Sequence, residues 1–197
     1  MNQDTVKSDK NSNRKAGKST AAASTTPELP PLFRKIDWWA FAISTLLVLV
    51  GYLITIAPDV TLEDSGELAV GSMYAGVPHP PGYPVWTLYT WLFTKLLPFS
   101  NIAWRVAVAS AVAGAFACGL IALVVSRGSS MMMEGIQALK DIDRRWESII
   151  CFVSGVVAAL LMGFNGYMWS QSVIVEVYSL SVLSLMGLIC CLLRWVY

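Results

Sequence analysis

The chain has 197 residues, of which 55% are hydrophobic and only 14% are charged. Soluble domains carry about 25% charged residues, so the composition argues against a water-soluble protein and indicates one that spans a membrane. The formal net charge is only +1, and we expect no nucleic-acid partner.

Residues 1–33 form a polar segment rich in Ser, Thr, Asn, Lys and Ala. The segment has almost no large apolar side chains, so it cannot bury enough surface to offset the entropy of ordering. No apolar core follows at the distance typical of a cleavable signal peptide. We therefore predict a disordered cytoplasmic tail, followed by a membrane domain over residues 34–197.

Four apolar stretches are long enough to cross a bilayer, since about 20 helical residues span a hydrocarbon core of about 30 Å. They cover residues 38–57, 104–126, 149–169 and 173–196. All four predict helices, so the expected fold is an all-α, polytopic helical bundle. The four cysteines lie inside apolar stretches without metal-type spacing, and we expect buried thiols.

A fifth hydrophobic stretch, 84–97, is too short to cross. Its apolar residues recur at three- and four-residue spacing, which predicts an amphipathic helix. The polar face carries Thr87, Thr90, Thr94 and Lys95. Trp86 and Trp91 suit the headgroup region, which tryptophan prefers. We predict an interfacial helix in the first outer loop.

The basic residues predict the orientation, because cytoplasmic loops carry the excess of Lys and Arg. Arg34 and Lys35 precede the first span, and a second basic group lies within 127–145. Residues 58–102 instead hold several acids and only Lys95. This pattern predicts a cytoplasmic N-terminus and an outer loop over 58–102. The predicted location is a bacterial inner (plasma) membrane.

The outer loop contains a pair of acids, Asp64 and Glu67, three residues apart. If Glu67 opens a short helix through Tyr74, both carboxylates lie on one side of its N-terminus. The same spacing is that of a capping box, in which both acids would cap the helix. The sequence leaves both interpretations open.

His79 is the single histidine, and it lies among Pro78, Pro80 and Pro81. Proline restricts the backbone to an extended path, so a stiff segment presents the imidazole. A hydrogen-bonded loop histidine is the plainer alternative.

Glu176 and Arg105 lie at the outer ends of predicted spans, with Glu176 in the first turn of the last one. Ionisable groups near the hydrocarbon are costly and usually face protein or water. Each side chain is therefore a site residue or an interfacial anchor, and Trp104 favours the anchor for Arg105. We find no zinc pattern, phosphate-binding glycine loop or nucleophile elbow, and assign no metal ligand.

The order of these features resembles a known pattern. A long span is followed by the acidic motif LEDSGEL at 62–68, a short helix, the HPPG element at 79–82, an interfacial helix and a span that starts near an Arg. This resembles the GT-C class of membrane glycosyltransferases, and specifically the protein O-mannosyltransferase-like family that includes transmembrane protein 260. The EVYSL stretch at 176–180 resembles that family's second outer motif.

The resemblance implies transfer of a sugar, mannose, from a polyprenyl-phosphate carrier to a protein or glycan acceptor outside the cytoplasm, by inverting displacement at the anomeric carbon. Asp64 matches the implied catalytic base. Glu67, His79 and Glu176 match outer positions around the substrates. On chemical grounds, Arg105, Lys95 or a divalent metal ion would offset charge on the leaving lipid phosphate. Members of the family have more helices, so we expect the chain to be the N-terminal part of a longer protein.

Two other functions remain open. A lipid-sugar transporter or flippase also fits acids near the membrane, but such proteins usually carry charges or broken helices at mid-membrane. A non-catalytic membrane assembly subunit would only maintain the fold, and it would tolerate substitution of Asp64.

Overall fold

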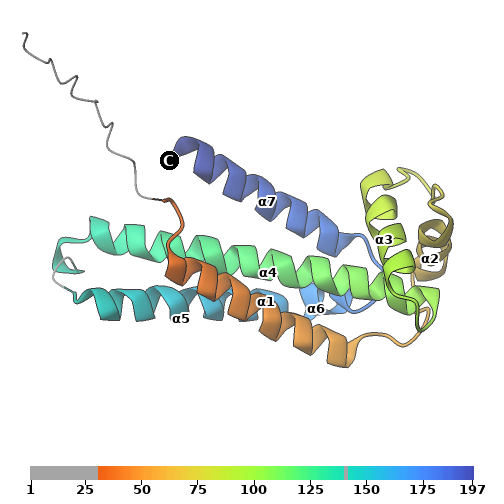
Figure 1. Cartoon of the computed structure of the whole chain (residues 1–197), viewed down its shortest axis with the longest axis horizontal. Helices are drawn as coiled ribbons and strands as arrows, with labels where there is room; N and C mark the ends of the chain where they lie inside the picture. Colours follow the sequence, from red (N-terminus) through yellow and green to blue (C-terminus); the bar gives the residue numbers. More distant parts are fainter. Residues whose placement is uncertain (1–30, 140–141) are drawn as a thin grey trace, which may run out of the picture. The chain divides into compact units, whose positions relative to one another are not determined.

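The computed structural model describes residues 31–139 and 142–197 (Figure 1). Within these residues the structure has seven α-helices, one short 3-10 helix and no strand. The predicted all-α class is therefore confirmed. The predicted tail at 1–33 lies outside the described residues, except for its last three positions.

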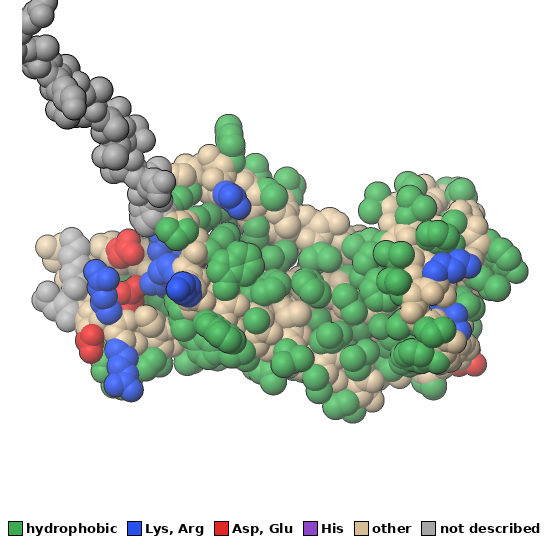
Figure 2. All heavy atoms as spheres, in the orientation of Figure 1, with side chains coloured by type: hydrophobic (Ala, Val, Ile, Leu, Met, Phe, Trp, Pro, Cys, Tyr) green, Lys and Arg blue, Asp and Glu red, His purple; other side chains and the backbone are tan. Residues whose placement is uncertain are grey.

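Four of the helices are long and apolar enough to span a membrane. They are α1 (Lys35–Thr55), α4 (Ile102–Gly135), α5 (Arg144–Gly163) and α7 (Tyr178–Val196). The remaining elements are α2 (Ser65–Tyr74), α3 (Pro84–Leu96), η1 (Gln137–Leu139) and α6 (Gly166–Ser172). Apolar side chains cover most of the face in Figure 2, and charged side chains gather toward its two ends. The chain is thus a membrane protein with the four spans that the sequence predicts.

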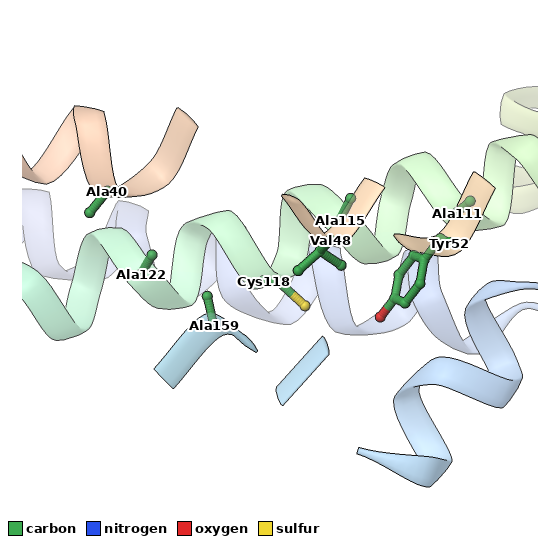
Figure 3. Close-up of a cluster of buried hydrophobic side chains, with 8 residues drawn as sticks. All are labelled: Ala40, Val48, Tyr52, Ala111, Ala115, Cys118, Ala122 and Ala159. Atoms are coloured by element: carbon green, nitrogen blue, oxygen red, sulfur yellow. The ribbon is translucent and has the colours of Figure 1, made fainter. Parts of the chain in front are cut away.

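Helix α4 is the centre of the bundle and contacts every other described α-helix. Helices α1 and α5 pack along its length, while α2 and α3 pack near its N-terminal end (Figure 1). The core between α1, α4 and α5 consists mainly of small side chains (Figure 3). Its buried residues are Ala40, Val48, Tyr52, Ala111, Ala115, Cys118, Ala122 and Ala159. Small residues let helix backbones approach closely, which is how helices associate where lipid removes the hydrophobic driving force.

The third predicted span, 149–169, is shorter in the structure than expected. Helix α5 ends at Gly163, and the side chain of Asn165 accepts a hydrogen bond from Met168 N at 2.9 Å. Asn165 is therefore the N-cap of a new helix, α6. Asparagine favours caps over helix interiors because its side chain competes for the backbone.

The fourth predicted span, 173–196, also begins later than expected. Helix α7 starts at Tyr178, so Glu176 precedes the helix instead of lying in its first turn. The carbonyl of Glu176 accepts hydrogen bonds from Trp86 Nε1 at 3.2 Å and Ser110 Oγ at 3.1 Å. Because these tertiary hydrogen bonds occupy the carbonyl of Glu176, this carbonyl does not accept the first backbone hydrogen bond of the helix.

Helix α3 has the predicted amphipathic pattern, and its polar side is the one that turns toward the protein. Its threonine side is buried against the protein, and Thr90 Oγ1 lies 2.7 Å from Ser72 Oγ of α2. The apolar side is outward, with Val85 72% and Leu88 61% exposed. Trp86, expected in the headgroup region, is only 4% exposed because it fills the space beside α4. An outward apolar face suits a helix whose surroundings are lipid.

A buried polar network joins α1, α4 and α5 at the end of the bundle away from α2 and α3. Asp37 is fully buried and accepts hydrogen bonds from Arg34 and, at 2.6 Å, from Ser126 Oγ. Arg34 also donates to Glu147 at 2.7 Å, and Ser130 Oγ donates to the same carboxylate at 3.0 Å. The pairing satisfies charges that would be costly to bury alone.

Candidate functional site

The predicted site residues lie at the end of the bundle where α2 and α3 meet the N-terminal end of α4 (Figure 1). A second buried cluster anchors both short helices there. It consists of Leu68, Ala69, Trp86, Ala103, Val106, Ala107 and Val175. Ser65 Oγ, at the start of α2, also donates to the carbonyl of Val175 at 3.3 Å. This packing brings the loop before α2 against the segment that carries Glu176.

Asp64 is the N-cap residue of α2, but its side chain makes no capping hydrogen bond. Its backbone has φ −85° and ψ 12°, outside the extended region that lets a cap side chain reach the next turn. The capping-box interpretation is therefore wrong for this helix. The side chain of Asp64 is 61% exposed, and its carboxylate is accessible.

Glu67 binds His79 instead of capping the helix. The backbone N–H of His79 donates to Glu67 Oε1 at 2.6 Å, and its Nδ1 lies 3.3 Å from Glu67 Oε2. On the other side of the ring, Nε2 lies 3.8 Å from Asp64 Oδ2. The imidazole thus lies between the two carboxylates.

The proline-rich segment holds His79 in this position. Gly82 N donates to the carbonyl of His79 at 2.9 Å. The ring of Tyr83 packs edge-on against the imidazole, with centroids 5.7 Å apart. Gly82 itself has φ +87°, a conformation that glycine adopts without strain. The local sequence therefore presents the imidazole from a constrained turn and not from the extended path that the prolines predict.

Glu176 is buried beside these residues, with 5% of its surface exposed. Burial, the largest effect, raises the pKa of its carboxyl from the usual 4.5 to about 7. A hydrogen bond to Glu63 and the negative charges of Glu63 and Asp64 add to the rise, while the backbone N–H of Val177 opposes it. Desolvation and like charges both favour the neutral form of an acid.

The sequence predicts no role for Glu63, which raises the pKa of Glu176. Its backbone lies in the left-handed region, with φ 63°. That conformation is uncommon for a residue other than glycine, and no sequence pattern around Glu63 signals it. In the sequence, the only sign that Glu63 belongs near the site is its position directly before Asp64.

Arg105 is engaged with the connection between α3 and α4. Its guanidinium donates to the carbonyls of Thr94 at 3.1 Å, Phe99 at 3.0 Å and Ser100 at 2.9 Å. Within the described residues, its side-chain hydrogen bonds all go to the last turn of α3 or to the loop that follows it. Arg105 thus holds this connection in place, and both predicted roles, the interfacial anchor and the contact with substrate, stay predictions.

Asp64, Glu67 and His79 also form a group that fits a divalent cation. Each offers one ligand atom, and these atoms all lie within 4.8 Å of one another. Carboxylate oxygens with an imidazole nitrogen are ligands that several divalent metals accept. No metal ligand is predicted from the sequence, because the three residues are not spaced as a local metal motif.

Comparison with known families bears on these same residues. The family model for the protein O-mannosyl-transferase TMEM260 N-terminal domain matches residues 64–197. The chain belongs to this family. The matched region starts at Asp64 and includes the other predicted site residues, so the suggested resemblance is confirmed.

Two relatives from this family share about a third or less of the aligned residues. Mouse protein O-mannosyl-transferase TMEM260 is 32% identical over 130 residues, covering 66% of this chain and 16% of the relative. The corresponding Dictyostelium discoideum protein is 27% identical over 132 residues, covering 66% and 14%. The chain thus spans about a sixth of the length of these relatives. Both are eukaryotic, so they give no support to the predicted bacterial location. No solved structure matches the chain.

Proposed function

We propose that the chain contributes the catalytic outer loop of a membrane glycosyltransferase of the GT-C class. The enzyme would transfer mannose from a polyprenyl-phosphate carrier to a protein or glycan acceptor on the non-cytoplasmic side. The main support is the accessible carboxylate of Asp64 beside His79 and Glu67 at one end of a four-span bundle. The names of the relatives, protein O-mannosyl-transferases, support the type of group transferred.

Displacement at the anomeric carbon needs one well-placed base. The acceptor hydroxyl oxygen forms the new bond to that carbon, and the bond from the carbon to the phosphate oxygen breaks with inversion. The phosphate leaves as an anion and needs no proton, whereas the neutral hydroxyl must lose one. Asp64 takes that proton, because its carboxylate is exposed and free of helix-capping bonds.

The neighbouring side chains have supporting roles in this proposal. Glu67 holds His79 through the backbone and the ring, so it positions the imidazole beside Asp64. Glu176 closes the inner side of the site and can carry a proton near neutral pH. Arg105 holds the α3–α4 loop, and we retain it as a candidate for the lipid phosphate.

A divalent cation held by Asp64, Glu67 and His79 would offset charge on the phosphate. In this form of the proposal the carboxylate of Asp64 binds a cation, whereas in the base role it accepts a proton. Transfer measured with and without a chelator separates them, because only the cation-dependent form loses activity with EDTA.

The orientation is part of the proposal. The acids and His79 lie at one end of the bundle, and the basic flanks Arg34, Lys35, Arg144 and Arg145 lie at the other end of their spans. The excess of basic residues favours the cytoplasm for that second end. Asp64 would then face the non-cytoplasmic side.

The test is Asp64→Asn in the full-length protein, assayed for transfer from a radiolabelled polyprenyl-phosphate sugar in membranes. Loss of a general base typically lowers the rate by about 10²- to 10⁴-fold. Because Asp64 caps nothing through its side chain, thermal stability should stay unchanged. Glu67→Gln should lower the rate less, since the amide oxygen can still accept from His79 N.

Asp59→Asn is the matched control, an exposed acid on the same loop, and it should transfer sugar normally. Near-normal transfer by Asp64→Asn would refute the base role and favour an assembly subunit. Loss of transfer in step with loss of folded protein would likewise refute it.

A further inference from the structure

An apolar groove lies at the opposite end of the bundle from Asp64, between α4, α7 and the residues before α1. Its volume is 430 Å³. The apolar walls are formed by Leu32, Phe33, Val124, Met131, Leu193 and Val196. Arg127 of α4 also lines this groove, so a cation lies in otherwise apolar surroundings.

Among the described residues, Arg127 has no carboxylate closer than 4.0 Å to pair with its charge. Its side chain is only 12% exposed, and its buried Nε has no hydrogen-bond acceptor among the described residues. The nearest carboxylate oxygen, on Glu134, is 4.0 Å from Nη1 and belongs to a side chain that is 67% exposed. Tyr197 contributes its ring face, 5.8 Å from the guanidinium carbon. A buried cation without a close anion is costly, and these contacts offset only part of that cost.

The groove lies at the level expected for lipid headgroups. Along α4, the 22 residues from Arg105 to Arg127 rise about 33 Å, close to the thickness of a hydrocarbon core. Lys35 at the start of α1 and Arg194 in the last turn of α7 lie near the same membrane boundary. Trp38, 51% exposed beside Lys35, also suits the interface.

We propose that this groove binds a phospholipid with an anionic headgroup. The guanidinium of Arg127 binds the headgroup phosphate through its free Nε–H, and an acyl chain lies along the apolar walls. Basic pockets between transmembrane helices are known to bind such headgroups. The site is separate from the proposed transferase site and does not depend on its activity.

The test uses the full-length protein, purified in a neutral detergent and analysed by native mass spectrometry with added lipid. Phosphatidylglycerol should bind at least about fivefold more tightly than phosphatidylcholine, and Arg127→Gln should lower that affinity about tenfold, equivalent to about 1.4 kcal/mol. Arg144→Gln is the matched control, because Arg144 is an exposed cation beyond the groove. It should bind phosphatidylglycerol like the unaltered protein.

A second variant fills the groove and keeps the arginine. A side chain added at Gly128 meets no atom within 4 Å at its Cβ, so Gly128→Leu should fold normally. It should also lower phosphatidylglycerol binding, because leucine occupies the space of the acyl chain. Circular dichroism and size-exclusion elution establish folding for each variant. If Arg127→Gln does not fold, phosphatidylglycerol binding by Gly128→Leu tests the proposal instead.

Three results would overturn the proposal. The first is equal binding of the two lipids, and the second is undiminished phosphatidylglycerol binding by the folded variants. The third is displacement of the lipid by millimolar inorganic phosphate, which would identify a site for free anions.

Discussion

At the residue scale, Asp64, Glu67 and Glu176 differ chiefly in their access to water. The side chains of Asp64 and Glu67 are 61% and 50% exposed, whereas Glu176 is 5% exposed. The buried carboxyl of Glu176 also feels the negative charges of Glu63 and Asp64. Burial raises the pKa of the Glu176 carboxyl to about 7, so its protonation will affect folding.

We predict that Glu176 makes stability depend on pH. Because its folded-state pKa of about 7 exceeds the usual 4.5, the folded protein binds more protons than the unfolded chain between these values. The free energy of unfolding should therefore fall as pH rises through this window and level off above it. Glu176→Gln should remove this fall and be more stable than the unaltered protein at pH 8, by on the order of 1–3 kcal/mol.

Thermal unfolding in detergent at half-unit steps from pH 4.5 to 8.5 measures the effect. Asp59→Asn serves as the control, because Asp59 is exposed and should leave the profile unchanged. An identical slope for Glu176→Gln and the unaltered protein would contradict the prediction.

The sequence predicted which residues gather at the site better than how they bind. The sequence predicted Asp64, Glu67 and His79 within one outer segment, and in the structure their side chains lie together across α2 and the loop after it. The bond between Glu67 and His79 N joins residues twelve positions apart, and local patterns do not encode it. Asp37 was missed for a similar reason, since its partner Ser126 lies on another helix.

At the element scale, the bundle depends on close contact between helix backbones. Gly155 of α5 packs on α4, and a Cβ there would lie 2.6 Å from the carbonyl oxygen of Ala122. The neighbouring atom is backbone and cannot move aside as a flexible side chain would. Gly187 of α7 instead has open space around it.

We predict that Gly155→Ala weakens the contact between α5 and α4. Overpacking a close contact typically lowers the free energy of unfolding by about 1–3 kcal/mol. Gly187→Ala is the control and should be neutral or slightly stabilising, because alanine favours helix over glycine. Thermal unfolding in detergent compares the two variants, and equal melting temperatures would show that the α4–α5 contact tolerates a methyl group.

Helix periodicity predicted where the helices lie in the sequence, but not which side of each helix turns toward the protein. The three- and four-residue spacing correctly gave a helix at 84–97, but the same pattern fits burial of either side. Which side turns inward depends on partners such as Ser72, which binds Thr90. Hydropathy likewise located the third span and could not detect the break at Asn165, because one capping hydrogen bond decides it.

At the scale of the whole molecule, the orientation in the membrane can be tested directly. Val77 in the loop after α2 is 86% exposed, and Met132 near the end of α4 is 69% exposed. These residues lie at opposite ends of the bundle. We predict that an impermeant thiol reagent applied to intact cells labels Val77→Cys and not Met132→Cys, because the basic flanks retain the second end in the cytoplasm.

The four natural cysteines are replaced in this background. They are Cys118, Cys151, Cys190 and Cys191. Membrane permeabilisation should make Met132→Cys reactive, which confirms that the thiol is accessible. Labelling of Met132→Cys alone in intact cells would show the opposite orientation.

The central position of α4 has a consequence for the order of events during synthesis. Helix α1 leaves the ribosome first, but Ser126, which binds Asp37, and Gly119, which lies against Thr45, both belong to α4. Insertion of α1 into the bilayer therefore precedes the packing of its polar face. The loop with Asp64 and His79 is made between these two helices and has only one anchored end until α4 inserts. The site can take its shape only after the second span has entered the membrane.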